Sequence, residues 1–385
     1  MSQCFMEALW SQIRSQFPAL TTCTYLNTAT FGQLSSRSQQ ATLEHFARRD
    51  NLASSDFLSW FNDLDQLRIA VAQLIQAPSG DDIAFFPNAS MVFSLLMNGI
   101  DWKPGDRIVT LEREFPNNLY LPSLLASQQG VEFVVTSWDN FWSAITPRTR
   151  LVAISTVNWA TGLRPPLDEL CHKLRQQGIL IYLDATQSCG AVQLDVTSVQ
   201  PDVVACDAYK WMCSPNGAGF GYFSESVRQW LKPNVIGWRS HKDWRSVDAL
   251  HEGSPEFPTG AERYEGGMVP FPSLYAMAES VRLFLAIGPA VVEQRVLNLA
   301  DQCRGVLRGL GAELMSEGSS HYNSPIIAAR WQGVDSVVLA KALRERKVHV
   351  SSRYGWLRVS VHFYNLEGDL NQLAVEAKGI LSALP

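Results

Sequence analysis

The chain has 385 residues and a mass of 42.9 kDa, more than one ordinary hydrophobic core holds, so we expect two lobes or one large α/β domain with an appendage. The formal net charge of −5 comes from scattered charges of both signs without a basic run, which argues against nucleic acid or an acidic membrane as the main partner. The expected ligand is a small molecule.

The seven cysteines are spread along the chain without Cys-x-x-Cys spacing, so neither a disulfide framework nor a zinc site is predicted. They are Cys4, Cys23, Cys171, Cys189, Cys206, Cys213 and Cys303. The first residues, Met1 to Trp10, contain Glu7 and no basic segment, and no apolar stretch reaches membrane-spanning length. We therefore expect a soluble cytoplasmic protein that binds no metal.

Apolar strands alternate with amphipathic helices through most of the chain, as in a mostly parallel, doubly wound α/β sheet. Strands are expected at Ile83–Phe86, Arg107–Leu111, Phe133–Thr136, Leu151–Ser155, Ile179–Leu183 and Val203–Cys206. Helices are expected at Ser90–Met97 and Pro166–Gln176.

Beyond about Gly267 the pattern changes, which predicts a smaller C-terminal α+β domain. Two long helices are expected at Ser273–Ile287 and Val291–Leu310, and short strands at Ile326–Arg330 and Leu357–Val361. The predicted units are an N-terminal segment packing on the small domain (1–24), a large α/β domain that binds the ligand (25–266) and a small α+β domain (267–385).

Three of the expected strands are followed by polar residues. These are Thr156 and Asn158 after the first, Asp184 and Gln187 after the second, and Asp207, Tyr209 and Lys210 after the third. Polar residues at strand ends are often only solvent-exposed. In open α/β sheets, however, ligands bind outside the carboxyl ends of the strands. Three such clusters in succession favour one shared cleft.

An acid and a lysine that converge on one cleft favour the cofactor pyridoxal phosphate. This cofactor needs a lysine to form an imine, a carboxylate to keep its ring nitrogen protonated, and an anion site for its phosphate. Lys210 is the candidate for the imine. Asp184 suits the carboxylate, because a pyridinium partner offsets the cost of burying its charge.

The phosphate site is expected at Asn88-Ala89-Ser90, where a strand turns directly into a helix. Such a turn offers free amides, and here a hydroxyl, at the positive end of the helix dipole. The alternative for Ser90 is an ordinary helix N-cap.

These residues carry a resemblance that covers nearly the whole chain. The sequence resembles the class V aminotransferase and cysteine desulfurase group of fold-type-I pyridoxal phosphate enzymes. The family's Asp-x-x-Gln segment is matched by DATQSCG (184–190), and its His-Lys-Trp-like segment by VVACDAYKWMCSPNGAGFGYF (203–223). That group includes isopenicillin N epimerase-like proteins, kynureninases and cysteine or cystine lyases. The resemblance implies that Lys210 forms the Schiff base, that Asp184 binds the pyridine nitrogen, and that Gln187 binds the ring hydroxyl or the imine region.

Weaker matches extend the resemblance to a residue that contacts the cofactor ring and to one that binds the substrate. EREFPNN (112–118) is similar to a family segment whose aromatic residue stacks on the cofactor ring, which implies that role for Phe115; the alternative is a core phenylalanine. WLRVSVHFYN (356–365) resembles the C-terminal signature whose arginine binds the substrate α-carboxylate, here Arg358. Arg353 either competes for that role or is a solvated strand residue.

Three further residues follow from looser similarity. YLNTATFG (25–32) is similar to a loop that borders the substrate, which implies contacts from Asn27 and Thr28. Asn158 lies one residue out of register with the family asparagine beside the cofactor oxygen, with Thr161 as its polar neighbour.

The chain departs from the family pattern at three positions. Asp207 stands where many relatives have a serine that donates to the phosphate, and we expect its side chain to point elsewhere. Tyr209 replaces a histidine and either contacts the phosphate or ring or is packed in the interior. Met268 replaces a threonine in a segment that reaches the phosphate of the partner subunit, so backbone amides would have to substitute. The resemblance thereby also implies a homodimer with active sites between subunits.

A persulfide-relay desulfurase is disfavoured, because no cysteine follows Cys303 and the loop before Arg358 lacks the family's sulfur-carrying residue. Transamination, carbon–sulfur lysis and epimerisation of an amino acid stay open, since all begin with proton removal at Cα by a base such as Lys210. A nicotinamide dehydrogenase is disfavoured, because the Gly-rich segment 217–223 leads into a strand-like run. A non-catalytic pyridoxal phosphate-binding relative stays open because of Asp207 and Met268.

Overall fold

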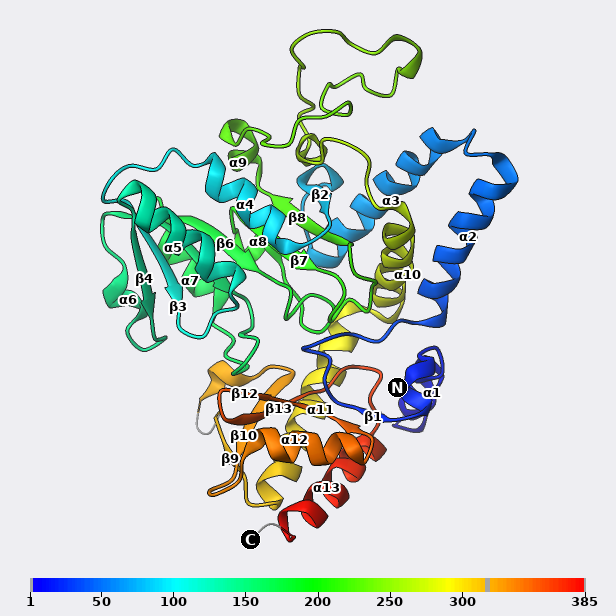
Figure 1. Ribbon diagram of the computed structural model, residues 1–385, viewed down its shortest axis with the longest axis vertical. Helices are drawn as coiled ribbons and strands as arrows, with labels where there is room; N and C mark the ends of the chain where they lie inside the picture. Colours follow the sequence, from blue (N-terminus) through cyan, green and yellow to red (C-terminus); the bar gives the residue numbers. More distant parts are fainter. Residues whose placement is uncertain (1–2, 316–318, 384–385) are drawn as a thin grey trace.

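The computed structural model describes residues 3–315 and 319–383 and shows a large α/β body joined to a smaller α+β body (Figure 1). The large sheet has the strand order β2-β8-β7-β6-β5-β3-β4. Its strands are β2 (Ile83–Phe86), β3 (Arg107–Leu111), β4 (Glu132–Thr136), β5 (Thr149–Ser155), β6 (Leu180–Asp184), β7 (Val203–Asp207) and β8 (Gly219–Phe223). The pairs among β3 to β7 are parallel, and β8 runs antiparallel to both β2 and β7.

Helices cover both faces of this sheet, which is why its central strands are buried apolar runs. The helices of the larger body are α2 (Ser36–Leu52), which packs on α10, α3 (Phe57–Ile75), α4 (Ala89–Gly99), α5 (Asn117–Gln129), α6 (Phe141–Ala144), α7 (Leu167–Arg175), α8 (Val196–Val199), α9 (Glu225–Trp230) and α10 (Phe271–Ile287). The mostly parallel, doubly wound sheet expected from the sequence is confirmed. The ends of the expected elements lie within two residues of the observed ones.

Strand β8 lies inside the Gly-rich segment 217–223. A Cβ atom on Gly219 would lie 2.5 Å from the Cys206 carbonyl oxygen of the adjacent strand β7. The glycine therefore permits close packing of strands, and the segment is not a nucleotide-binding turn.

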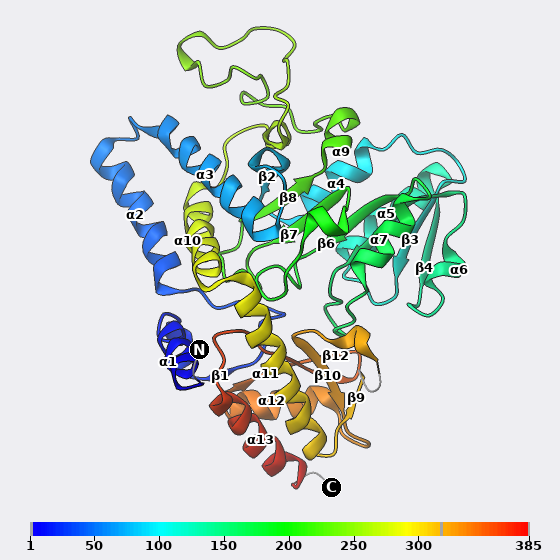
Figure 2. The same ribbon diagram turned by 180° about the vertical axis from the view of Figure 1, so that it is seen from behind.

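The smaller body is a four-stranded antiparallel sheet of order β12-β13-β10-β9, packed with helices. Its elements are α11 (Pro289–Gly309), β9 (Glu313–Leu314), β10 (Ile326–Arg330), α12 (Ser336–Glu345), β11 (Val348–His349), β12 (Ser351–Arg353), β13 (Trp356–Ser360) and α13 (Glu367–Leu381). Figure 2 shows α10 beside α2 and α3 and the chain entering the smaller body through α11. The chain bends by 85° between α10 and α11, at Gly288.

Neither α10 nor α11, nor any other single helix in residues 3–315 and 319–383, is long and apolar enough to cross a membrane. Taken together, α10 and α11 have the length and apolar composition of a membrane span, but the two helices form a bent pair.

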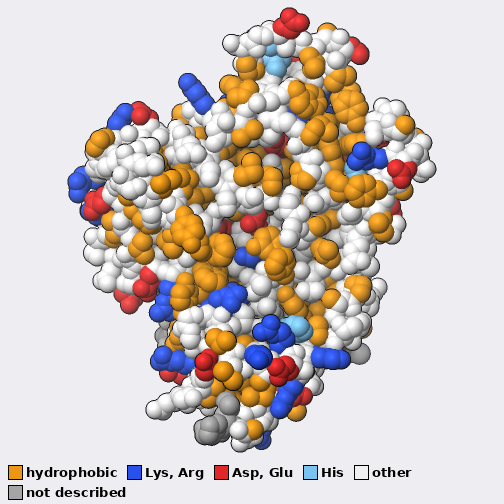
Figure 3. Space-filling model, viewed as in Figure 1, with side chains coloured by type: hydrophobic (Ala, Val, Ile, Leu, Met, Phe, Trp, Pro, Cys, Tyr) orange, Lys and Arg blue, Asp and Glu red, His pale blue; other side chains and the backbone are white. Residues whose placement is uncertain are grey.

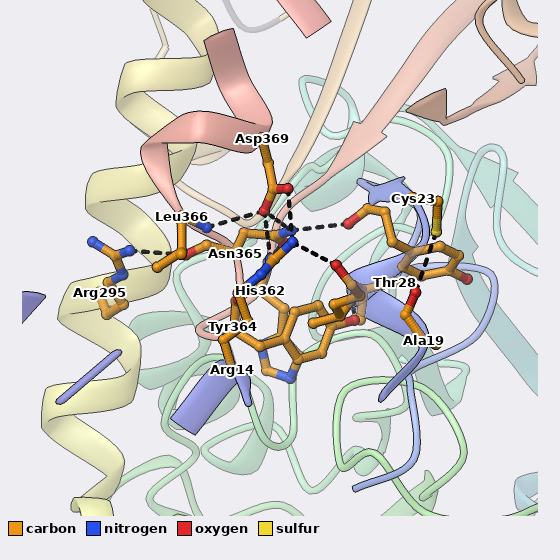
Figure 4. A network of polar contacts seen from close by, with 12 residues as sticks. Arg14, Ala19, Cys23, Thr28, Arg295, His362, Tyr364, Asn365, Leu366 and Asp369 are labelled. Atoms are coloured by element: carbon orange, nitrogen blue, oxygen red, sulfur yellow. Dashed lines mark hydrogen bonds and ion pairs between the residues drawn. The ribbon is translucent and has the colours of Figure 1, made fainter. Parts of the chain in front are cut away.

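The N-terminal helix α1 (Gln3–Arg14) and the strand β1 (Thr24–Tyr25) join the chain start to the smaller body. Arg14 Nη1 donates to Asp369 Oδ2 at 2.7 Å, within the polar network of Figure 4. Phe17 packs on the Tyr364 ring with centroids 5.0 Å apart, and β1 pairs in parallel with β11. The start of the chain is thereby fixed close to the segment that follows β13.

Candidate active site

A pocket of about 370 Å³, including its open mouth, lies at the carboxyl ends of β5, β6 and β7. Parallel strands deliver the residues that follow them to the same sheet edge, so segments remote in sequence meet here. The lining residues are Ala89, Ser90, Phe115, Asn117, Ser155, Trp159, Asp184, Thr186, Gln187, Asp207, Tyr209 and Lys210.

Lys210 follows β7 and is 6 % exposed. Burial lowers the pKa of its amine to about 8, against the opposing effect of the Asp184 and Asp207 carboxylates. Its Nζ lies 5.1 Å from the centre of the Phe115 ring and 5.3 Å from that of Tyr209. An amine with this pKa keeps a neutral, nucleophilic fraction near neutral pH.

The loop that carries Lys210 is held by three other segments. The Gly32 N–H donates to the Tyr209 carbonyl at 2.9 Å, and a Cβ atom on Gly32 would lie 1.8 Å from the Lys210 carbonyl oxygen. His362 Nε2 donates to the Trp211 carbonyl at 2.8 Å, since a carbonyl can only accept. A Cβ atom on Gly190, whose φ is +95°, would lie 2.4 Å from the same Trp211 oxygen. These contacts fix the backbone on both sides of the amine.

Asp184 is the last residue of β6 and is buried. Its Oδ1 accepts a hydrogen bond from the Thr186 N–H at 2.9 Å. Burial raises the pKa of this carboxyl, while Thr186 and the Lys210 charge act in the opposite direction. A cationic ring N–H placed in the pocket would offset that burial cost and keep the carboxylate ionised.

Gln187 lies three residues after Asp184, and both the oxygen and the nitrogen of its side-chain amide make hydrogen bonds. Its Oε1 accepts from Trp211 Nε1 at 2.8 Å, and its Nε2 donates to the Ala29 carbonyl at 3.1 Å. The side chain therefore lines the pocket in a fixed orientation.

The N-terminus of α4 borders the pocket through Ala89 and Ser90. The N-cap is Asn88, whose Oδ1 accepts from the Met91 N–H at 3.0 Å, so the alternative of an N-cap role for Ser90 is wrong. The expectation that Asp207 points elsewhere is also wrong. Its Oδ1 accepts from the Ala89 N–H at 3.1 Å, because β7 ends directly beside this helix terminus.

Phe115 lines the mouth of the pocket and is 40 % exposed, so it is not a core phenylalanine. Its ring meets Trp159 edge to face with centroids 5.5 Å apart. Tyr209 also lines the pocket, with its ring 4.9 Å from that of Phe31, and burial raises the pKa of its hydroxyl to about 12. Met268 is 58 % exposed.

Arg358 comes from β13 and is 1 % exposed. Its guanidinium donates to four oxygen atoms, all of them uncharged: Ser351 Oγ (3.0 Å), Trp159 O (2.6 Å), Thr30 Oγ1 (2.6 Å) and Asn27 Oδ1 (3.4 Å). Burial, helped by the nearby charge of Arg353, lowers the pKa of Arg358 to about 9. A buried cation held by neutral acceptors gains from an anionic ligand.

Asn27 and Thr28 differ in where their side chains lie. Asn27 Oδ1 accepts from Arg358 and from Thr30. Thr28 is fully buried, and its hydroxyl shares a hydrogen bond of 2.7 Å with the Tyr364 hydroxyl (Figure 4). Thr28 therefore faces the interior of the smaller body, whereas Asn27 faces the arginine.

Asn158 and Arg353, like Asn27, Thr28 and Arg358, lie outside the lining of the pocket. Asn158 Nδ2 donates to the Arg113 carbonyl at 3.0 Å, and its Oδ1 accepts from the Ala160 and Thr161 N–H groups. The guanidinium of Arg353 stacks 5.4 Å from the Trp159 ring, so Arg353 is not a freely solvated residue.

Several pocket residues were not assigned a role from the sequence. Ser155 and Thr186 lie at strand ends, so the rule that located Asp184 also applies to them. Glu114 lies behind the pocket, where it accepts from the Ser155 N–H at 2.6 Å and from Asn118 Nδ2 at 3.1 Å. Burial raises the pKa of Glu114 to about 7. No signal in the sequence distinguishes it from a surface glutamate.

The fold and this pocket define a fold-type-I enzyme that depends on pyridoxal phosphate. The donor set fits the cofactor: a buried amine of lowered pKa, a buried carboxylate across from it, an aromatic ring at the mouth and a helix N-terminus with a serine. Asp207 adds a second carboxylate to the lining, beside that of Asp184, and its charge has the wrong sign for binding an anion.

Comparison with known proteins identifies the family. The profile of the Aminotransferase class-V family matches residues 48–373, and the chain belongs to this family. A probable cysteine desulfurase of Methanothermobacter thermautotrophicus is 24 % identical over 94 % of this chain and 95 % of its own length. An isopenicillin N epimerase of Amycolatopsis lactamdurans is 31 % identical over 61 % of each chain. The solved structure of a C-DES mutant with glycine covalently linked to its cofactor superposes with a TM-score of 0.87 at 20 % identity, covering 95 % of this chain and 98 % of that one.

Proposed function

We propose that the protein acts at the α-carbon of an amino acid through Lys210, by transamination or by carbon–sulfur lysis. The observation that carries the proposal is the buried amine of Lys210, facing the buried carboxylate of Asp184 in one pocket. Amino-acid epimerisation is the second candidate, favoured by the 31 % identity to an isopenicillin N epimerase.

Pyridoxal phosphate supplies an aldehyde that condenses with amines and a protonated ring that takes up electrons from the substrate α-carbon. Asp184 would keep the ring nitrogen protonated, and Gln187 and Phe115 would hold the ring. Ala89 and Ser90 would hold the phosphate at the N-terminus of α4.

Lys210 holds the cofactor and moves the Cα proton of the substrate. The pKa of about 8 suits this task, because the amine is a good base yet is partly deprotonated at working pH. Tyr209 and Asn158 support this end of the site, Tyr209 from the pocket lining and Asn158 by fixing the adjacent loop.

Arg358 binds the substrate α-carboxylate, and Asn27 orients the guanidinium. Binding of a carboxylate requires the guanidinium to exchange some of its present neutral acceptors for charged oxygens. That exchange is favourable in a buried site, because a charged pair replaces an uncompensated cation. Thr28 supports the loop of Asn27 from the interior side.

A protein thiol is not proposed as a sulfur carrier. A persulfide acceptor needs an accessible thiol of low pKa. Burial instead raises the pKa of Cys206 and Cys213, the two cysteines that flank Lys210 in sequence. A lyase would therefore release its sulfur product directly to solution.

We also propose a cytoplasmic homodimer with an active site at each subunit contact. Exposed apolar side chains close to the pocket support this proposal, among them Phe31 against Tyr209, Met91 in the first turn of α4, and Phe115. Sedimentation at several protein concentrations tests it, and a monomer at micromolar concentration contradicts it.

A panel of amino acids tests the reaction, with keto acid, pyruvate, sulfide, ammonia and substrate chirality measured in parallel. Sulfide with pyruvate from cysteine or cystine selects the lyase. A keto acid with the cofactor left in its amine form selects transamination, and a racemised substrate alone selects epimerisation. An absorbance spectrum that no amino acid changes would contradict catalysis and favour a cofactor-binding relative without activity.

A further inference from the structure

Asp207 ends β7 at the point where the phosphate of the cofactor is assigned. Its Oδ1 accepts from the Ala89 N–H at 3.1 Å, and its own N–H donates to Thr186 Oγ1 at 3.1 Å. A Cβ atom on Gly219 of the neighbouring strand would lie 3.5 Å from the Asp207 Cα, so β8 packs closely against its backbone. The carboxylate is held at the N-terminus of α4 by this packing.

The chain thus fills part of its own anion site. Among the first amides of α4, that of Ala89 is bound by Asp207 and that of Met91 by the Asn88 side chain. These amides, with the positive end of the dipole, are what a helix N-terminus offers to a phosphate. A phosphate placed there meets a carboxylate that competes for the same N–H and repels it.

We propose that Asp207 competes with the cofactor phosphate for the N-terminus of α4, so that the chain gains little affinity from the phosphate. This inference rests on the proposed function, which assigns the phosphate to Ala89 and Ser90. It implies that the chain distinguishes weakly between pyridoxal phosphate and pyridoxal, which lacks the phosphate.

The charges around Asp207 set how this competition depends on pH. The groups that face it are Asp184 from the end of β6, and Tyr209 and Lys210 from the loop after β7. Burial, followed by the Asp184 charge, raises the pKa of Asp207 to about 6. The carboxylate is therefore charged at pH 8 and largely neutral at pH 5, and the competition is strongest at the higher pH.

The variant Asp207→Asn tests the proposal, because an amide oxygen still accepts from the Ala89 N–H while the charge is removed. The dissociation constants of pyridoxal phosphate and pyridoxal are measured by titration of the cofactor-free protein at pH 8. We expect the variant to bind pyridoxal phosphate about 10- to 100-fold more tightly and pyridoxal within about twofold of wild type. At pH 5.5 the gain for pyridoxal phosphate should shrink.

The matched control is Asp202→Asn at the opposite end of β7. Asp202 is buried and, like Asp207, accepts a backbone N–H, that of Ile181 at 2.8 Å, but it lies outside the pocket lining. We expect both dissociation constants to be unchanged. Asp207→Ser is the second variant, used if the asparagine variant fails to fold.

Three results would overturn the inference: an unchanged ratio of the two dissociation constants in Asp207→Asn, weaker binding of pyridoxal phosphate in that variant, or an equal gain in Asp202→Asn. Failure of the proposed function gives a different result, in which no variant and no wild-type protein binds either aldehyde at Lys210.

Discussion

The two ends of β7 carry the same side chain in similar surroundings. Asp202 precedes the strand and Asp207 ends it, and both are buried enough for burial to raise the carboxyl pKa. Asp202 accepts from the Ile181 N–H and lies 3.8 Å from Arg175, a partner on the surface helix α7. Asp207 accepts from the Ala89 N–H and shares a pocket with Lys210.

What separates the two ends is the room beside each carboxylate. At the Asp202 end, the carboxylate meets the Ile181 N–H of β6 and Arg175 of α7, and the residue is structural. At the Asp207 end, parallel strands leave Asp184, Asp207 and Lys210 around an open pocket of about 370 Å³. Buried charge beside open space marks a ligand site, because the ligand can supply the missing partner. Figure 3 shows Lys and Arg side chains gathered on one face where the two bodies meet, which suits a carboxylate substrate.

The largest expected effect comes from removing one acid at each edge of the sheet, Asp184 at the carboxyl edge and Asp202 at the opposite edge. Asp184→Ala should lower turnover by about 10²- to 10³-fold, since it removes the charge that we propose keeps the cofactor ring protonated. Asp202→Ala should keep turnover near wild type and lose about 1–3 kcal/mol of the free energy of unfolding, because the Ile181 N–H is left unpaired. Steady-state kinetics and urea unfolding measure both. Equal losses of turnover in the two variants would contradict a functional difference between the ends.

A smaller effect is expected at Arg358, the proposed substrate anchor. Arg358→Lys should raise KM about 10- to 100-fold with the cofactor still attached, because lysine cannot make the two parallel hydrogen bonds of a guanidinium. Arg353→Lys is the control, since Arg353 stacks on the same Trp159 ring but is only half-buried, whereas Arg358 is fully buried. A larger KM effect in Arg353→Lys would transfer the anchor role to Arg353.

The third effect concerns Glu114 and appears in stability as a pH dependence, with no change expected in turnover. Its pKa rises from the ordinary value to about 7 in the folded protein, so the folded state binds the proton more tightly than the unfolded state. The stability that this proton contributes is present below the unfolded pKa and is lost as pH rises through about 7. Glu114→Gln should remove about 3 kcal/mol of this pH-dependent loss between pH 4.5 and pH 8. If the free energy of unfolding changes equally between the two pH values in the variant and in the wild type, the raised pKa of Glu114 is contradicted.

The sequence predicted the sheet and the residues at its carboxyl edge, because strand periodicity places Asp184 and Lys210 after buried runs. It failed where side-chain direction depends on distant packing. Asp207 meets Ala89 only because β7 ends beside α4, and Arg358 is enclosed by oxygens from three separate segments. Glu114 becomes a high-pKa carboxyl through burial that no local pattern encodes.

The most direct measurement of the central claim is borohydride reduction of the protein saturated with pyridoxal phosphate, followed by peptide mapping. The predicted result is one pyridoxyl label per chain, on the peptide that contains Lys210, and none in Lys210→Ala. A label confined to another lysine, or no label at all, would contradict the account.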